Sequence, residues 1–164
     1  MKAIIQRVMK ASVTVGDETV SSIGSGVCVL LGISRYDTVK EMDSIIKKIL
    51  NLRIFEDDDG KRWNKSVKDR DMEILCVSQF TLQSIMKGNK LDFHRAMSAD
   101  KSEEFYNLFL DKLRKSYKID KVKDGKFGAY MQVHIQNDGP VTVELDYPPT
   151  KPDKADDAKE SEKD

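Results

Sequence analysis

The sequence is poor in the residues from which most catalytic and metal-binding sites are built. Its 164 residues include only two cysteines and two histidines, and the cysteines are not at CxxC spacing. Cys28 and Cys76 each lie inside an apolar run, which predicts buried free thiols rather than disulfides. There is also no Gly-rich phosphate loop, dinucleotide-binding fingerprint or Gly-x-Ser-x-Gly elbow. We therefore expect neither a metal nor a cofactor.

Long hydrophobic runs and an excess of either charge are missing as well. The longest apolar run, residues 27–33, is too short to cross a bilayer. The first residues, Met1 to Arg7, are strand-like and charged, unlike a signal peptide. The 28 basic and 28 acidic residues cancel, which at first sight argues against a nucleic-acid-binding protein. These absences predict a cytoplasmic protein with no membrane segment.

Positive charge is nevertheless concentrated in one part of the chain. Between residues 112 and 126, seven lysines and arginines face only Asp120 and Asp124. Such a patch is compatible with phosphate contacts, but equally with a solvated helix end followed by a polar turn. Residues 148–164 are rich in charge and proline and almost free of apolar side chains. We expect a disordered tail there, after a single domain of residues 1–147.

Hydrophobic periodicity predicts a mixed α/β fold. Strands are expected at residues 2–9, 11–15, 27–33, 52–55, 74–80, 121–124, 131–135 and 141–145. A first helix follows Thr38, which forms a capping-box pattern with Glu41, and a second opens near Ser98. The second helix should turn one apolar face to the core: Phe105, Leu108, Phe109 and Leu113. Two helices cannot cover both faces of so many strands. Either the sheet folds over on itself, or an exposed face pairs with a second subunit.

The segment Ser78-Gln79-Phe80-Thr81-Leu82 follows a buried strand and places hydroxyl and amide groups at its end. Function concentrates where a rigid strand passes into a loop. Ser78 or Thr81 could act as a nucleophile only with a base oriented by a third group, and His94 and His134 lie in no recognisable triad motif. If the chain is an enzyme, its catalysis should rest on positioning and backbone donors.

A second polar segment, Asn137-Asp138-Gly139-Pro140, separates two alternating runs and predicts a tight hairpin. The Gly139-Pro140 bond can be interpreted in two ways. It is either a turn in which proline replaces an unneeded N–H donor, or a cis peptide that holds the glycine carbonyl at a fixed angle. Only about 5% of such bonds in folded proteins are cis, so the residues alone favour the turn.

These segments together resemble the signature segments of the D-aminoacyl-tRNA deacylases. The resemblance extends over residues 1–146 and includes Gln6-Arg7-Val8, Arg53-Ile54-Phe55-Glu56-Asp57, Ser78-Gln79-Phe80-Thr81-Leu82, Gly128-Ala129-Tyr130-Met131-Gln132-Val133 and Asn137-Asp138-Gly139-Pro140-Val141-Thr142. It implies a homodimer of a three-layer α/β/β fold. It also implies an enzyme that hydrolyses the ester between a D-amino acid and the 3′ end of tRNA, and that accepts glycine as well.

The resemblance further implies roles for individual residues. Gly139-Pro140 would be a cis-proline motif that reaches into the partner's pocket, excludes L side chains and is fixed by Arg7. Ser78, Gln79, Phe80 and Thr81 would form the pocket floor, with the ribose 2′-hydroxyl and backbone groups assisting hydrolysis. The other substrate-binding residues would be Phe127, Met131 and Asn137. Our own inference adds tRNA contacts at residues 112–126 and 87–95. Two rivals remain: an RNA-binding dimer without catalysis, and a hydrolase in which Thr81 is a covalent nucleophile.

Overall fold

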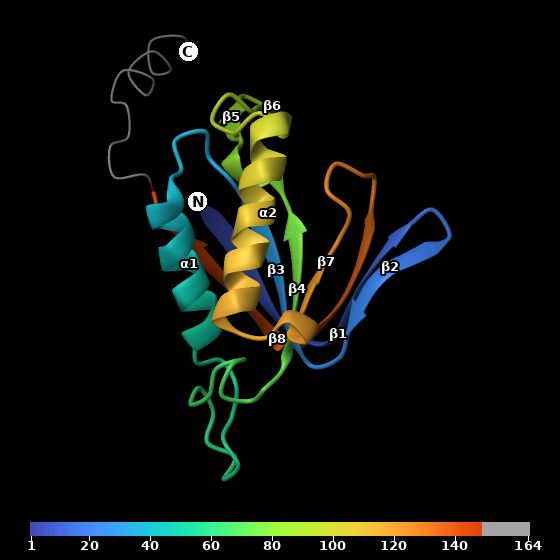
Figure 1. Ribbon diagram of the computed structural model, residues 1–164, viewed down its shortest axis with the longest axis vertical. Helices are drawn as coiled ribbons and strands as arrows, with labels where there is room; N and C mark the ends of the chain where they lie inside the picture. Colours follow the sequence, from blue (N-terminus) through green and yellow to red (C-terminus); the bar gives the residue numbers. More distant parts are fainter. Residues whose placement is uncertain (149–164) are drawn as a thin grey trace.

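The computed structural model describes residues 1–148 and shows a mixed sheet with two main helices (Figure 1). The strands are β1 (Lys2–Val15), β2 (Glu18–Ile23), β3 (Gly26–Gly32), β4 (Glu73–Ser78), β5 (Ile85–Lys87), β6 (Lys90–Asp92), β7 (Val122–Asp124) and β8 (Gln132–Asp146). The helices are α1 (Val39–Asn51), α2 (Ala99–Ser116) and two short 3₁₀ turns, η1 (Phe80–Gln83) and η2 (Ile119–Lys121). The predicted capping box of Thr38 and Glu41 is confirmed at the start of α1.

The main sheet has the order β2-β1-β3-β4-β7, and β8 pairs with β1. Strands β3, β4 and β7 are parallel to one another, whereas β1 is antiparallel to β2, β3 and β8. The carboxyl ends of parallel strands meet at one edge of a sheet, where binding sites of such folds usually lie. Here that edge holds the ends of β4 and β7.

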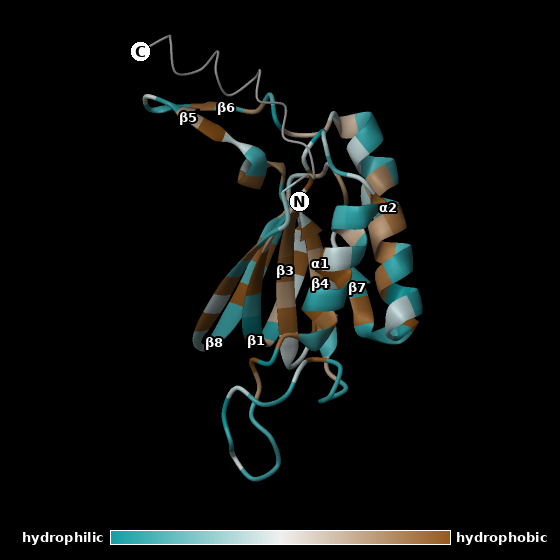
Figure 2. Cartoon of the chain, turned by 90° about the vertical axis from the view of Figure 1, so that its left-hand side faces the viewer, coloured by the Kyte–Doolittle hydropathy of each residue, from teal (hydrophilic) through white to brown (hydrophobic). Residues whose placement is uncertain are grey.

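The sheet folds over on itself, as one of the two sequence-based alternatives proposed. Helices α1 and α2 pack on one face of β3 and β4 and enclose a core that includes Val29, Ile45 and Phe109. The opposite face carries a second buried cluster that joins Cys28 and Leu75 of the central strands to Val13 of β1. Figure 2 shows the β1–β8 arm on the side away from α2. The result is a nearly closed, barrel-like sheet covered by helices on one side.

The predicted hairpin at residues 137–140 is wrong. Both halves of the segment belong to the single strand β8, which stays antiparallel to β1 from the pair Thr14–Gln132 to the pair Lys2–Asp146. Likewise, residues 2–9 and 11–15 form one strand, because β1 continues through Lys10. The tight-turn pattern was misleading because the polar residues form a bulge, defined here as residues 138–141. The register places the bulge opposite Arg7 alone.

Two smaller predictions also need correction. Residues 52–55 form no strand, since only Phe55 makes an isolated bridge, to Lys65. In α2 the exposed fraction of Leu108 is 42%, and the residues that face the core are Ser102, Tyr106, Phe109, Leu110 and Leu113. The buried face is therefore rotated from the predicted one, because Tyr106 packs between Phe109 and Phe127.

The two cysteines are free and buried, as predicted. Burial raises the pKa of the Cys28 thiol to about 12, and burial likewise raises the pKa of Cys76. Neither thiol is therefore a ready nucleophile. In residues 1–148 no helix is long and apolar enough to cross a membrane. From residue 149 onward, the tail predicted to be disordered lies outside the described residues.

Candidate active site

Residues 78–83, named here the strand exit, leave the carboxyl edge of the sheet and are held tightly to β3. The amide of Gln79 donates to the carbonyl of Leu31 at 2.7 Å, and the side chain of Gln83 donates to the carbonyl of Gly32 at 2.9 Å. A Cβ atom at Gly32 would lie 2.6 Å from Cβ of Leu82, so this close approach requires glycine. The strand exit is therefore positioned by its backbone.

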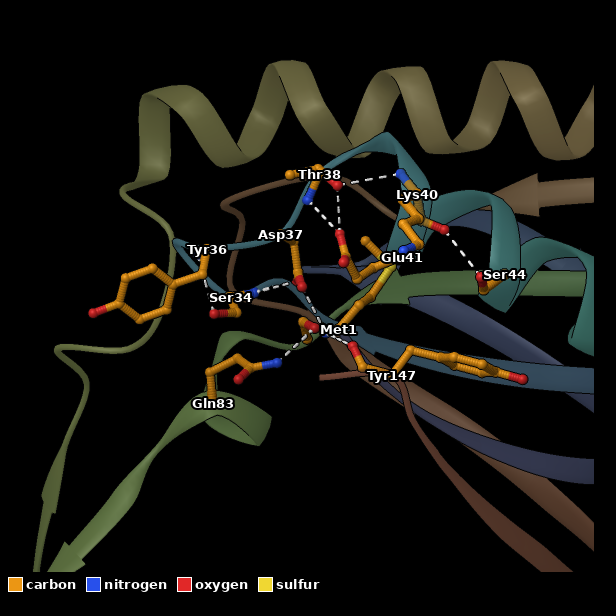
Figure 3. Close-up of polar contacts among 11 residues, drawn as sticks. Met1, Ser34, Tyr36, Asp37, Thr38, Lys40, Glu41, Ser44, Gln83 and Tyr147 are labelled. Carbon is orange, nitrogen blue, oxygen red and sulfur yellow. Dashed lines mark hydrogen bonds and ion pairs between the residues drawn. The ribbon is translucent and has the colours of Figure 1, made fainter. Parts of the chain in front are cut away.

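A buried polar cluster supports the same edge (Figure 3). The ammonium group of Met1 forms an ion pair with Asp37 at 2.7 Å, and neither partner is exposed. The second carboxylate oxygen of Asp37 accepts from the amide of Ser34 at 2.7 Å. Burial is the largest influence on the pKa of Asp37 and raises it. The pair joins the start of β1 to the connection between β3 and α1, next to Gln83 (Figure 3).

The side chains of the strand exit combine a polar floor with an exposed aromatic ring. The side-chain amide of Gln79 donates to the hydroxyl of Thr81, and Ser78 is half-buried. Phe80 is 54% exposed, and its ring centroid lies 5.1 Å from that of Phe93. The turn η1 begins at Phe80, so the first N–H groups have no acceptor inside the turn. The exit thus offers backbone donors beside an apolar wall.

Each of the two histidines has a polar partner outside the strand exit. His94 pairs with Asp92 at the base of the β5–β6 hairpin, and His134 contacts the hydroxyl of Thr14 at 3.2 Å on the β1–β8 arm. The hydrogen bonds of Asp92 to His94 and Lys87 hold the pKa of its carboxyl well below the usual range. No group of three or more His, Cys, Asp or Glu side chains in residues 1–148 is arranged to hold a metal ion.

The loop after β7 lies beside the strand exit, because Asp124 pairs with Cys76 on β4. Phe127 packs against the ring of Tyr106 with 5.7 Å between centroids. The sulfur of Met131 accepts from the amide of Lys126 at 3.4 Å. The structure thus brings the predicted adenosine-binding residues Phe127 and Met131 to the same edge as Ser78.

The two predicted basic segments occupy different places. Residues 87–95 form most of the β5–β6 hairpin, which projects from the carboxyl edge of the sheet (Figures 1 and 2). The segment 112–126 runs from the end of α2 to β7. Two of its cations are already paired: Lys112 with Asp43 at 3.0 Å and Lys118 with Asp71 at 2.7 Å. Both segments reach the neighbourhood of the strand exit: β5 follows Gln83 closely in the chain, and residues 125–126 begin the loop after β7.

The bulge in β8 is held by Arg7 and Asn137. The guanidinium of Arg7 donates to the carbonyl of Asp138 at 3.2 Å and to that of Ile54 at 2.7 Å. The side chain of Asn137 donates to the hydroxyl of Thr142 and accepts from the amide of Val141, both at 2.9 Å. The Gly139-Pro140 bond is cis, and both residues are exposed. The simpler interpretation, a trans turn, is therefore wrong.

The strand exit and the bulge lie at opposite edges of the sheet within one chain. Arg7 pairs with Val27 near the start of β3, whereas Ser78 pairs with Leu31 near its end. Val27 and Leu31 are four residue steps apart, which corresponds to about 13 Å along the strand. A group as small as one ester bond cannot contact both segments of the same chain.

A cavity of about 530 Å³ adjoins the bulge and includes residues that the sequence interpretation did not use. Its walls contain Arg62, Trp63 and Arg70 together with Arg7, Gly139 and Pro140. The signal for this site was present in the sequence, because Trp63 is the only tryptophan and stands in a polar segment. It could not be connected with Gly139-Pro140 without the fold.

Comparison with protein families gives one match over nearly the whole described chain. The family described as D-Tyr-tRNA(Tyr) deacylase matches residues 4–146. The chain is 66% identical to D-aminoacyl-tRNA deacylase 1 of Homo sapiens over 148 residues, which cover 90% of this chain and 71% of the relative. It is 60% identical to D-aminoacyl-tRNA deacylase of Drosophila melanogaster, with 92% and 95% covered.

Solved structures agree with this match. The structure of a protein called c-Myc DNA Unwinding Element Binding Protein superposes with a TM-score of 0.88 at 66% identity, covering 90% of this chain and 99% of the other. A second, described as a probable eukaryotic D-amino acid tRNA deacylase, has a TM-score of 0.78 at 19% identity, covering 89% and 98%. The second likeness shows the fold alone.

Proposed function

The chain belongs to the D-Tyr-tRNA(Tyr) deacylase family, and on this basis we propose that its substrate is the ester between a D-amino acid and the terminal adenosine of tRNA. The enzyme class is that of the relatives, a D-aminoacyl-tRNA deacylase that hydrolyses ester bonds. One observation carries the proposal: the strand exit, Arg7 and Gly139-Pro140 all lie within the matched residues. The proposal includes a cytoplasmic enzyme, because charged tRNA is used there in translation.

We propose that the site is built from two copies of the chain. The strand exit and the loop with Phe127 and Met131 provide one side, and the bulge of a partner subunit provides the other. Their separation by about 13 Å within one chain supports this arrangement, because closed C₂ symmetry brings two different segments together twice. Arg7 and Asn137 would position Gly139 and Pro140 rather than bind the substrate directly.

Chirality would be selected by exclusion. The exposed bulge offers backbone carbonyls to the amino group of the substrate and leaves no space for an L side chain, so L substrates are rejected by steric clash. Glycine, which has no side chain, would be accepted with D-amino acids. The N–H groups of Phe80 and Thr81 would stabilise the oxyanion, and the ribose 2′-hydroxyl would assist the attack of water. Because an aminoacyl ester is already activated, these groups and a positioned water would be sufficient for hydrolysis.

A covalent role for Thr81 is the first alternative. Its hydroxyl accepts a hydrogen bond from Gln79, an arrangement that positions the oxygen but removes no proton from it. Positioning predicts that Thr81→Ala lowers kcat by about tenfold, whereas loss of a nucleophile lowers it by about 10⁴-fold or more. Single-turnover hydrolysis of D-tyrosyl-tRNA by both proteins distinguishes the two.

The test of the proposed function is the release of labelled tyrosine from D-tyrosyl-tRNA and from L-tyrosyl-tRNA. We expect the D ester to be hydrolysed at least about 100-fold faster, which corresponds to about 2.7 kcal/mol of discrimination. Equal release of both would leave an esterase but refute the exclusion of L side chains. A parallel measurement with glycyl-tRNA tests whether glycine is accepted.

A nucleic-acid-binding protein without catalysis is the second candidate. It is favoured by the solved structure at 66% identity, whose protein is called a DNA Unwinding Element Binding Protein. This candidate predicts salt-dependent binding of nucleic acid with no release of tyrosine from either ester. Any D-specific hydrolysis above the uncatalysed rate excludes it as the whole function.

A further inference from the structure

The indole of Trp63 is displayed at the surface. The residue is 58% exposed, although tryptophan is usually largely buried in folded proteins. Its backbone has φ +59°, in the left-handed region that residues other than glycine rarely adopt. Such a conformation persists only where the surrounding structure imposes it, and it gathers at binding and catalytic sites.

The loop of residues 56–72 that carries Trp63 is well anchored. Phe55 and Lys65 exchange two backbone hydrogen bonds of 2.9 and 2.8 Å. The carboxylate of Asp57 accepts from the amides of Asp59 and Lys61 at 2.9 Å and from the side chain of Asn64 at 2.7 Å. These hydrogen bonds, above all that of Lys61, lower the pKa of Asp57. The indole is thus presented on a defined turn.

The surroundings of Trp63 fit a single-stranded nucleic acid. Arg62 and Arg70 line the same cavity, and the guanidinium of Arg7 lies 6.0 Å from the centroid of the indole. Glu56 and Asp138 are the acidic residues of the lining. Arg7 is paired with Asp138 at 3.3 Å and Arg70 with Asp58 at 2.8 Å, so the phosphate contact is assigned to Arg62. An exposed aromatic ring with nearby arginines is the combination on which unpaired bases stack while their phosphates are neutralised.

The position of the loop indicates which strand it meets. Figures 1 and 2 show the 56–72 loop projecting at the end of the molecule opposite to the β5–β6 hairpin. Trp63 therefore lies far from the strand exit of its own chain but shares a cavity with Gly139 and Pro140. Any assembly that brings this bulge to a partner's strand exit also brings Trp63 to the mouth of that site.

We propose that Trp63 and Arg62 bind the unpaired nucleotides that precede the terminal adenosine of the tRNA held in the partner subunit's site. One base stacks on the indole, and the adjoining phosphate contacts the guanidinium of Arg62. This inference rests on the proposed function and deepens it, because it assigns a nucleotide subsite to the subunit that supplies the bulge. Each substrate then contacts both copies of the chain.

The single tryptophan provides a direct binding test. Stacking of a base changes the emission of the indole, so an uncharged RNA hairpin ending in unpaired CCA should quench the fluorescence of the full chain. The same hairpin with a blunt end is the matched ligand, and it should quench at least about tenfold more weakly at equal concentration. Equal quenching by both RNAs, or none by either, overturns the proposal.

Kinetics test the role in the reaction. For Trp63→Ala and Arg62→Ala we expect KM for D-tyrosyl-tRNA to rise about tenfold with kcat unchanged. Hydrolysis of D-tyrosyl-adenosine, which lacks the preceding nucleotides, should not change. Trp63→Phe should retain most of the affinity. Leu108→Ala, at a residue that is 42% exposed on α2 and outside both predicted tRNA-contact segments, is the matched control and should behave as wild type.

Two results would overturn the subsite. Equal losses on both substrates would mean that Trp63 only supports the bulge, and unchanged KM for tRNA would mean that it binds no nucleotide. Failure of the proposed function gives a different result, because the wild-type chain would then hydrolyse neither D ester.

Discussion

At the scale of single residues, the pair of Met1 and Asp37 is expected to stabilise the fold strongly. Removing one charge of a fully buried pair leaves the other without compensation, so Asp37→Asn should lower the free energy of unfolding by about 3 kcal/mol. The control is Asp43→Asn, whose partner Lys112 lies 3.0 Å away on the surface; a loss below about 1 kcal/mol is expected there. Urea unfolding measures both. Similar losses of unfolding free energy in the two variants would show that burial does not make the Met1–Asp37 pair more stabilising than a surface pair.

At the scale of elements, one hydrogen bond joins α2 to the end of β7. The hydroxyl of Tyr106 donates to Asp124 at 2.6 Å. Burial raises the pKa of Asp124 above its ordinary value of 3.8, and the bond from Tyr106 opposes this rise. Since Phe127 follows in the next loop and packs on Tyr106, the bond also helps to position a proposed adenosine-binding residue.

Tyr106→Phe should therefore destabilise the protein in a pH-dependent manner. At about pH 7 Asp124 loses a donor while buried and charged, a cost of about 1 to 3 kcal/mol. A carboxyl whose pKa is raised by folding contributes stability that is complete below its ordinary pKa and is lost as the pH rises through the raised value. Without Tyr106 this pKa rises further, so the penalty should shrink towards about pH 4.

The control for this prediction is Tyr117→Phe. The hydroxyl of Tyr117 donates to the carbonyl of Met72 at 2.8 Å, and a carbonyl does not titrate. Its penalty in urea unfolding should be the same at both pH values. An equal pH dependence in the two variants would show that Asp124 is not responsible.

At the scale of the whole molecule, a site shared between two copies predicts complementation. In Gly139→Ala, the added Cβ would lie 3.0 Å from the guanidinium of Arg7 at a residue with φ +125°, so the bulge would be displaced. Thr81→Trp would fill the strand exit. Each variant alone should be nearly inactive in hydrolysis of D-tyrosyl-tRNA.

Refolding the two variants together should restore activity. Random pairing makes half of the dimers mixed, and each mixed dimer keeps one intact site of two, so about a quarter of the wild-type activity is expected. Each variant refolded with itself is the control. Absence of recovery, with mixed dimers verified by mass, would place both segments in one chain's site and refute the shared arrangement.

Features that depend on neighbours along the chain could be predicted from the residues alone. The capping box of Thr38 and Glu41, the buried strands around Cys28 and Cys76, and the polar strand exit all follow from short-range patterns. The family could be identified for the same reason, since its motifs are contiguous. These patterns specify local conformation and burial, and they were confirmed where the structure describes them.

Features that depend on distant partners became visible only in the folded chain. Asn137 to Pro140 resembled a hairpin turn, but β1 runs beside both flanking segments and keeps them in one strand. Leu108 matched the helical period, yet the contacts of Tyr106 set the rotation of α2. The role proposed for Trp63 depends on a cavity that it shares with Gly139, a residue far away in the sequence. Long-range pairing and packing override local preference because they bury more surface than a turn or a single side chain can.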